Sequence, residues 1–171
     1  MTLGADEQLQ RALELAYAYL NRRDRTIAEV RQTLQRKGIS ESLSEATIRT
    51  LTEQRFLDDT RFVQLYVSDK RELEQWGSDR IRRGLLARGI DRELADAALA
   101  GSMADLGPAG PSADDEAPES ELDRALALLR RRFPGPAVDH RDRERALGLL
   151  LRKGYETEIA LDALAAHARD D

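Results

Sequence analysis

Few residues of this chain have the types and the spacing that chemistry on a substrate requires. Asp58 and Asp59 are adjacent carboxylates, and paired carboxylates can carry out acid–base catalysis. Neighbouring residues on a helix do not face each other, however, and an aspartate at a helix start commonly caps it. His140 and His167 are far apart and lack the spacing of a zinc-binding helix. We therefore interpret Asp58 as a cap and the histidines as exposed or loop residues.

The motifs of phosphate-binding loops and activated nucleophiles are also missing from the sequence. Gly77, Gly84 and Gly89 do not match the GxxxxGK[ST] pattern, and no activated serine motif occurs. The chain has no cysteine, which excludes disulfides and thiolate metal sites. We expect no catalytic, cofactor-binding or metal-binding residue, and a protein that is not an enzyme.

Basic side chains gather at equivalent places, in the last helical turn before a glycine and along the helix that leads to it. The interleaved aspartates and glutamates favour a solvated face with local ion pairs for most individual arginines. If the helices stack, the bases could form a positive row that suits phosphates or an acidic protein groove. The partner-binding candidates are Arg36, Lys37, Arg80, Arg82, Arg83, Arg88, Arg152 and Lys153.

The helices that would position these bases come from a sequence pattern that occurs three times in the chain. The heptapeptides LQRKGIS, LLARGID and LLRKGYE align on Gly38, Gly89 and Gly154. Apolar residues stand eight and four residues before each glycine and one, five and ten residues after it. Agreement at all these positions indicates three tandem repeats.

Each heptapeptide predicts a helix-turn-helix corner. The apolar spacing marks one face of a helix, and a base in its last turn suits the negative end of the helix dipole. Glycine then takes the left-handed conformation that ends many helices. Ser40 and Asp91 are expected to cap the helices that follow, and Thr157 could serve in the third copy.

Each copy also has an earlier helix, at about residues 9–23, 60–74 and 122–133 by apolar spacing. Asp58 caps the second of these, with Leu57 and Phe62 as a hydrophobic staple. Thr26 and Glu29 form a capping box. No stretch alternates as a strand would, so the fold is predicted to be all-α, in repeats of three helices.

The net charge of −5 resides in one segment of the 171 residues. Residues 102–120 are acidic, contain proline and glycine, and carry no base, which is typical of a flexible linker. The expected domains are residues 1–57, 58–101 and 121–171, separated by that linker. No apolar run approaches a membrane span and no signal peptide is evident, so a cytoplasmic protein is expected.

Trp76 is the one tryptophan and precedes Gly77 at a helix start. Core packing or a staple is the simpler interpretation, because tryptophan is mostly buried. An exposed aromatic anchor at an interface is the alternative.

Three stretches together resemble the RecX family of bacterial recombination regulators: residues 26–40, 55–91 and 144–164. The most specific feature is LDD-x-RF with a following W-G and an I-x-x-x-L-x-x-x-G-I pattern. Its residues here are Leu57, Asp58, Asp59, Arg61, Phe62, Trp76, Gly77 and Gly89, beside the corner residues Gly38 and Gly154. Gly84, residues 102–120 and residues 133–140 depart from the family pattern.

The resemblance implies an elongated, curved array of three-helix repeats that binds the RecA–DNA filament along its groove. It also implies a monomer that inhibits filament growth, ATP hydrolysis, strand exchange and co-protease action without catalysis. One alternative is a direct DNA-binding protein, and another is a helical scaffold with no link to nucleic acid. Reversing Arg82, Arg83 and Arg88 to glutamate is expected to weaken inhibition while leaving helicity intact.

Overall fold

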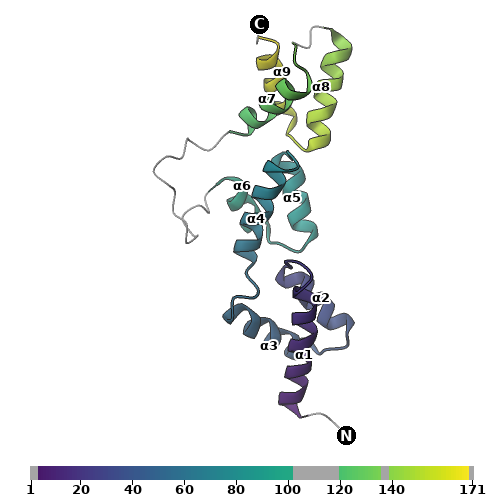
Figure 1. Cartoon of the computed structure of the whole chain (residues 1–171), viewed down its shortest axis with the longest axis vertical. Coiled ribbons are helices and arrows are strands. Elements are labelled where there is room, and N and C mark those ends of the chain that lie inside the picture. Colours follow the sequence, from purple (N-terminus) through teal and green to yellow (C-terminus); the bar gives the residue numbers. More distant parts are fainter. Residues whose placement is uncertain (1–3, 102–119, 136–138, 170–171) are drawn as a thin grey trace. The chain divides into compact units, whose positions relative to one another are not determined.

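The computed structural model describes residues 4–101, 120–135 and 139–169, and every element within these ranges is a helix (Figure 1). The all-α prediction is therefore confirmed for the described residues. The nine helices there are α1 (Ala5–Leu20), α2 (Ile27–Arg36), α3 (Glu41–Glu53), α4 (Asp59–Glu72), α5 (Ser78–Ala87), α6 (Arg92–Leu99), α7 (Glu121–Arg132), α8 (His140–Lys153) and α9 (Thr157–His167).

The helices follow one another in threes, as the repeats predict, with α1, α4 and α7 as the first helix of each. The predicted acidic linker falls on residues 102–119, which lie outside the described residues. Ser120, its last predicted residue, caps α7 by accepting a hydrogen bond from the Asp123 N–H. The elongated and curved arrangement stays a prediction.

The three glycine corners share one backbone geometry. Gly38, Gly89 and Gly154 have φ angles of 79°, 78° and 88°, in the left-handed region. In each corner the glycine N–H donates to the carbonyl three residues earlier, at 2.9, 2.9 and 3.0 Å. The next residue donates to the carbonyl of the leucine that precedes the glycine by four, at 3.1 Å in all three. These two bonds define a Schellman helix end.

The aligned apolar positions form the core. The residues eight and four before each glycine are all 0% exposed: Val30, Ile81, Ala146, Leu34, Leu85 and Leu150. After the glycine, Ile90 and Tyr155 are buried and Ile39 is half-buried. The repeat in the sequence is therefore a repeat in packing.

Most predicted caps are present. Thr26 and Glu29 form the capping box of α2, and the Asp58 carboxylate accepts the Arg61 N–H at 2.9 Å. The prediction that Thr157 caps α9 is wrong, because Thr157 is already helical and Glu156 stands at the cap position without a side-chain cap bond. The position of the cap relative to the corner glycine is nevertheless the same in all three repeats. Glu156 follows its glycine by two residues, as the capping residues Ser40 and Asp91 do.

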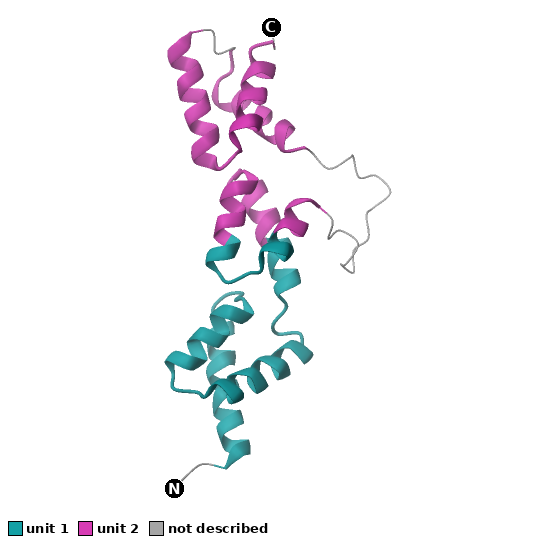
Figure 2. Ribbon diagram, turned by 180° about the vertical axis from the view of Figure 1, so that it is seen from behind, with its two compact units in different colours: residues 1–65, 85–95 teal, residues 66–84, 96–171 magenta. Residues whose placement is uncertain are grey.

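The chain divides into two compact units (Figure 2). The first unit comprises residues 1–65 and 85–95, and the second comprises residues 66–84 and 96–171. The division passes through α4, α5 and α6, so each unit joins an end repeat to part of the second repeat. One buried cluster includes Ala12, Leu13, Ala16, Val30, Leu34, Ile48, Leu51 and Leu57, and another includes Ala125, Leu128, Leu129, Ala146, Leu150, Tyr155, Ala160 and Ala163.

The middle helix of the third repeat starts earlier than its counterparts. α2 and α5 both begin eleven residues before the corner glycine, whereas α8 begins fourteen residues before it. Asp139 caps this additional stretch by accepting the Asp142 N–H at 2.7 Å.

Candidate functional site

The junction between the first and second repeats lies within the first unit. The Thr26 hydroxyl donates to the Arg88 carbonyl oxygen at 2.7 Å. The Ile27 N–H donates to the Asp59 carboxylate at 2.9 Å. A Cβ on Gly89 would lie 2.3 Å from the Ala28 Cβ, so only glycine allows this approach.

The junction between the second and third repeats lies within the second unit and follows the same plan. The Gly77 N–H donates to the Lys153 carbonyl at 2.9 Å. The Ser78 N–H and hydroxyl donate to the two oxygens of Glu121 at 2.7 and 2.8 Å. Gly154 packs against Arg80, whose Cβ would lie 2.2 Å from an added Cβ.

The two junctions are equivalent position by position. Thr26 and Gly77 both lie twelve residues before their corner glycine and both donate to the carbonyl just before the next corner glycine. Asp59 and Glu121 are each the first residue of a repeat's first helix, and each caps the middle helix of the repeat before it. These contacts assign Asp59 and Gly77 to the assembly of the repeats.

The sequence analysis missed the cross-repeat role of Asp59 and Glu121. The one sequence feature that could have indicated this role is the carboxylate that begins both α4 and α7. The partner N–H groups lie 32 and 43 residues away, so local spacing could not reveal them.

Two of the predicted partner-binding arginines form ion pairs within their own unit. Arg88 donates through Nε and a terminal nitrogen to both oxygens of Glu29 at 3.0 Å, and its guanidinium lies 4.6 Å from the Phe62 ring centroid. Arg82 pairs with Asp96 at 2.6 Å and Asp79 at 2.8 Å. The expectation of local ion pairs among interleaved charges is confirmed for Arg82 with Asp79, whereas the partner of Arg88 lies 59 residues away in the sequence.

Arg80 and Lys153 contact the junction in the second unit. Arg80 lies 4.1 Å from the Trp76 ring centroid and donates to the Arg152 carbonyl at 3.0 Å. Lys70 lies 4.6 Å from the same ring, and Lys153 donates to the Glu74 carbonyl at 2.7 Å. Trp76 is half-buried, and Lys70 and Arg80 both lie over its ring.

Besides Arg80, which is exposed but contacts the Trp76 ring, four candidates are exposed without an ion pair to any described residue: Arg36, Lys37, Arg83 and Arg152. Arg36 donates to the Thr33 hydroxyl, and Arg83 donates to the Asp79 carbonyl. The first two lie in the first unit and the last two in the second. These four are the predicted bases that a partner could reach without breaking an internal pair.

The Glu29 carboxylate predicts an acid-sensitive junction. Burial alone raises the pKa of Glu29, but the hydrogen bonds from Arg88 and the Thr26 N–H outweigh it and leave the pKa below its usual 4.5. The stabilisation is thus fully present above pH 4.5 and is lost as the pH falls through the lowered pKa. Glu29→Gln is expected to cost about 1–2 kcal/mol of unfolding free energy at pH 7.

Urea unfolding of wild type and Glu29→Gln at several pH values tests this expectation. The difference between the two proteins should be constant near neutrality and shrink below pH 4.5. Arg31→Gln, which removes a more exposed pair to Glu45 in the same unit, serves as a control with a smaller effect. A difference that persists undiminished at acid pH would contradict the assignment.

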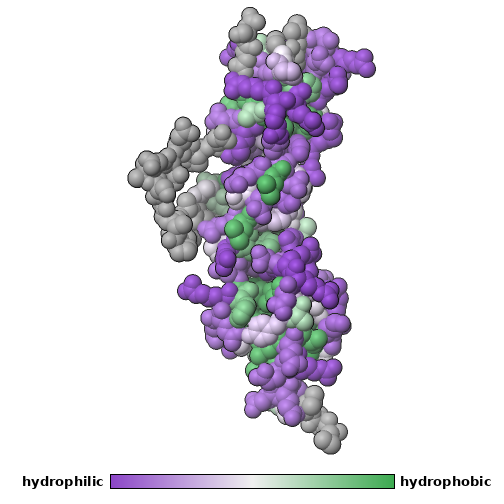
Figure 3. Space-filling model, in the orientation of Figure 1, coloured by the Kyte–Doolittle hydropathy of each residue, from purple (hydrophilic) through white to green (hydrophobic). Residues whose placement is uncertain are grey.

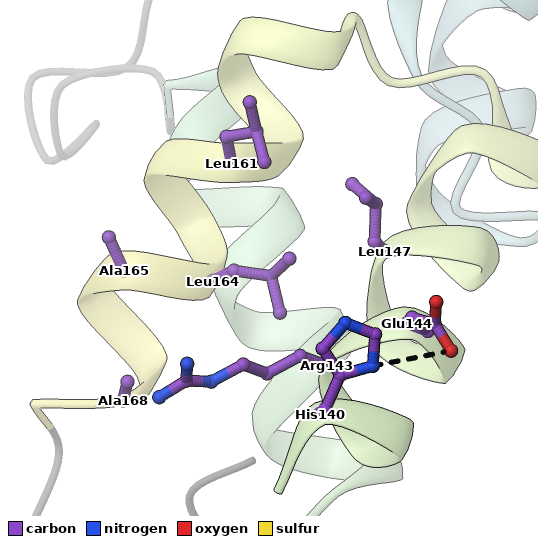
Figure 4. Close-up of a pocket in the computed structure, with 8 residues that line it drawn as sticks. All are labelled: His140, Arg143, Glu144, Leu147, Leu161, Leu164, Ala165 and Ala168. Atoms are coloured by element: carbon purple, nitrogen blue, oxygen red, sulfur yellow. Dashed lines mark ion pairs between the residues drawn. The ribbon is translucent and has the colours of Figure 1, made fainter. Parts of the chain in front are cut away.

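A largely aliphatic hollow of about 470 Å³ lies between α8 and α9 (Figure 4). Leu147 of α8 faces Leu161 and Leu164 of α9, while His140 and Glu144 lie at one end with 3.6 Å between the His140 Nδ1 and a Glu144 carboxylate oxygen. Both of these side chains are largely exposed. The hollow therefore lacks the buried titratable groups that acid–base catalysis uses.

His167 corrects the expectation that both histidines are exposed. It is 3% exposed on α9, and neither ring nitrogen has a hydrogen-bond partner among the described residues. The apolar spacing of α9 places it on the buried side with Ala160 and Ala163.

The described surface offers no cluster of metal ligands and no helix long and apolar enough to cross a bilayer. Hydrophobic side chains appear as small patches within a hydrophilic face (Figure 3).

Comparison with known proteins points to one family. The model described as "RecX, first three-helix domain" matches residues 12–51, and "RecX, second three-helix domain" matches residues 58–99. The regulatory protein RecX of Mycolicibacterium vanbaalenii is 30% identical, with 98% of this chain and 89% of the relative covered. The RecX of Xanthomonas axonopodis pv. citri is 33% identical, with 86% of this chain and 80% of the relative covered.

Solved structures agree at the level of the fold. The crystal structure of RecX from Lactobacillus salivarius has a TM-score of 0.73 at 20% identity and covers 95% of this chain and 97% of that one. A second crystal structure, of a regulatory protein RecX, has a TM-score of 0.65 at 19% identity, covering 97% of this chain and 79% of that one.

Proposed function

Because the chain belongs to the RecX family of regulatory proteins, we propose that it binds the filament that RecA forms on DNA and restrains it. The family consists of regulators and not of enzymes. The observation that carries the proposal is the match to RecX proteins over nearly the whole chain. Binding is expected to inhibit filament growth, ATP hydrolysis, strand exchange and co-protease activity.

The repeats suit a filament, which presents the same surface at regular intervals. Modules of one design can contact successive protomers, so that several weak contacts add up to firm binding. Arg36 and Lys37 precede the first corner glycine and Arg152 precedes the third, all exposed. Cations at repeated positions would meet repeated acidic or phosphate groups of the filament groove. A protein held across neighbouring protomers would then oppose the spacing that hydrolysis requires.

Direct reading of DNA is supported less well. A recognition helix follows the turn of a helix-turn-helix and presents base-reading side chains. Here the helices after the corners are α3, α6 and α9, and their sequences are mainly acidic and apolar. Contact with DNA would therefore be weak or indirect.

Filament binding and bare DNA binding can be separated in one experiment. The chain is added to preformed RecA–DNA filaments and to the same DNA alone at about 0.15 M salt, where exposed charges are largely screened. We expect tight binding to the filament alone, with inhibition of RecA ATP hydrolysis. Equal binding to bare DNA would favour the DNA-binding alternative.

The exposed bases are tested by Arg36→Glu, Lys37→Glu and Arg83→Glu combined. Exposed pairs contribute up to about 1 kcal/mol each, so the triple variant should inhibit RecA ATP hydrolysis at least about tenfold less well. Arg82 and Arg88 are unsuitable for this test because their reversal would break internal ion pairs.

A control for that variant reverses three exposed cations away from the corners, Arg11, Arg22 and Arg132. Both triple variants change the net charge equally, so a loss of inhibition common to both would reflect charge alone. Unchanged inhibition by the folded corner variant would remove Arg36, Lys37 and Arg83 from the interface.

A further inference from the structure

A polar hollow of about 210 Å³ opens on the first unit and contains unpaired arginines. It is lined by the segment before α2, the segment between α3 and α4, and the first turns of α4. Arg25, Arg55 and Arg61 come one from each of these segments. None of the three forms an ion pair with a described residue, in contrast to Arg31 and Arg88 of the same unit.

Arg25 leaves a donor unsatisfied. Its Nε is buried and has no hydrogen-bond partner among the described residues. Its guanidinium lies 4.1 Å from the Tyr19 ring centroid, so the ring fixes the plane of the group. Arg25 also lines the hollow, so its terminal nitrogens can donate to an acceptor that enters there.

The backbone at Arg55 is strained. Its φ is 60°, in the left-handed region where a residue other than glycine costs roughly 1 kcal/mol. This conformation ends α3, because the Arg55 N–H donates to the Thr52 carbonyl at 3.0 Å and the Phe56 N–H donates to the Leu51 carbonyl at 2.9 Å. It turns Arg55 toward the hollow. The next residue, Phe56, is 58% exposed and meets the Tyr17 ring edge-on at 5.2 Å between centroids.

The rest of the lining indicates what the acceptor is. Asp24 and Asp58 stand among the arginines, and the Asp58 carboxylate already accepts the Arg61 N–H. These carboxylates would repel the continuous negative charge of a nucleic acid. A peptide instead supplies N–H groups for carboxylates as well as an acidic side chain for guanidiniums. Phe56 and Leu65, 58% and 46% exposed, add apolar surface at the hollow.

We infer that this hollow, the Arg25–Arg55–Arg61 hollow, binds a protein segment in which a carboxylate is flanked by apolar side chains. The carboxylate enters among the three guanidiniums and accepts hydrogen bonds from their terminal nitrogens. The apolar neighbours cover Phe56 and Leu65. That the bound segment belongs to RecA rests on the proposed function, whereas the chemistry of binding is argued from the hollow alone.

The first test uses short probes and does not involve RecA. The full chain is titrated with acetyl-Leu-Asp-Glu-Phe-amide, with the neutral acetyl-Leu-Asn-Gln-Phe-amide, and with a thymidine tetranucleotide, and NMR follows the arginine Nε–H and Phe56 ring signals. We expect the acidic peptide alone to shift the signals of Arg25, Arg55, Arg61 and Phe56, at least about tenfold more tightly than the neutral one. Binding of the nucleotide in preference, or no acidic-peptide binding, would overturn the inference.

The variant Arg55→Gly with Arg61→Gln supplies the second test. Glycine adopts a φ of 60° without strain, so this variant should keep its circular dichroism spectrum and melting temperature. It should bind the acidic peptide at least about tenfold less tightly. Arg11→Gln with Arg22→Gln removes the same charge from the same unit outside the hollow and should bind as wild type. Equal peptide binding by all three proteins would overturn the inference.

RecA enters only in a last comparison with preformed filaments. If the hollow variant loses filament affinity and the control does not, the segment belongs to the filament. If the peptide binds in the hollow while the wild-type protein does not bind filaments, the proposed function is wrong but the hollow is still a binding site for an acidic protein segment.

Discussion

Replacing Gly77 with alanine is expected to lower the unfolding free energy of the second unit by about 3 kcal/mol. An added Cβ would lie 2.4 Å from three backbone atoms of Gly154 and Tyr155. Those atoms belong to the third corner and cannot rotate away as a side chain would. The substitution would also disturb the hydrogen bond from the Gly77 N–H to the Lys153 carbonyl.

Gly84→Ala is the matched control, because it adds the same methyl group to the same unit. Its Cβ would lie 2.5 Å from the Tyr66 hydroxyl, the far end of a flexible side chain that can shift. Alanine also gains up to about 1 kcal/mol of helix propensity within α5. We therefore expect a change smaller than about 1 kcal/mol.

Urea unfolding followed by the fluorescence of Trp76 measures both variants. This residue is the one tryptophan, stands next to Gly77 and has Lys70 and Arg80 over its ring, so its fluorescence reports on the junction. Equal stability of Gly77→Ala and Gly84→Ala would show that the close approach at Gly77 is not required.

Arg88→Glu is expected to destabilise the first unit by about 2–4 kcal/mol. The substitution would place a second carboxylate next to that of Glu29. The site is sheltered, because the Arg88 and Glu29 side chains are only 22% and 19% exposed. The stacking of the guanidinium on Phe62 would be lost as well. Like charges in so sheltered a place cannot be screened as surface charges are.

The exchange of both charges, Glu29→Arg with Arg88→Glu, should recover about half of that loss. It restores an ion pair but not the capping bond from the Thr26 N–H to the Glu29 carboxylate, which contributes about 1 kcal/mol. Amide hydrogen exchange of residues 26–36 follows the junction directly. A double variant no more stable than Arg88→Glu alone would show that the pair itself contributes little.

The fold was predictable because its signals are local. A leucine, a base, a glycine and a cap within seven residues contain the whole of a Schellman corner, so Gly38, Gly89 and Gly154 could be placed from the sequence. Thr26 with Glu29 is a similarly short motif. The exception, Thr157, arose because a glutamate occupies the cap position of the third copy and offers no side-chain bond.

The surface was less predictable because its contacts join distant residues. Nothing near Arg88 in the sequence indicates that Glu29, 59 residues away, neutralises it. A cluster of bases on α5 therefore suggested a binding surface where Arg82 and Arg88 form internal pairs. The unpaired arginines, Arg25 and Arg55, lie in connecting segments that show no periodic pattern.

The early start of α8 changes the site at which the first two repeats accept the next one. In the first two repeats, the residue eleven positions before the corner glycine, Ile27 or Ser78, donates its N–H to a carboxylate of the following repeat. At the equivalent place in the third repeat, the Arg143 N–H is donated to the Asp139 carbonyl within its own helix. A carboxylate that approached the third repeat in the register of Asp59 and Glu121 would find this donor occupied, so the third repeat presents a different surface at this place from the first two.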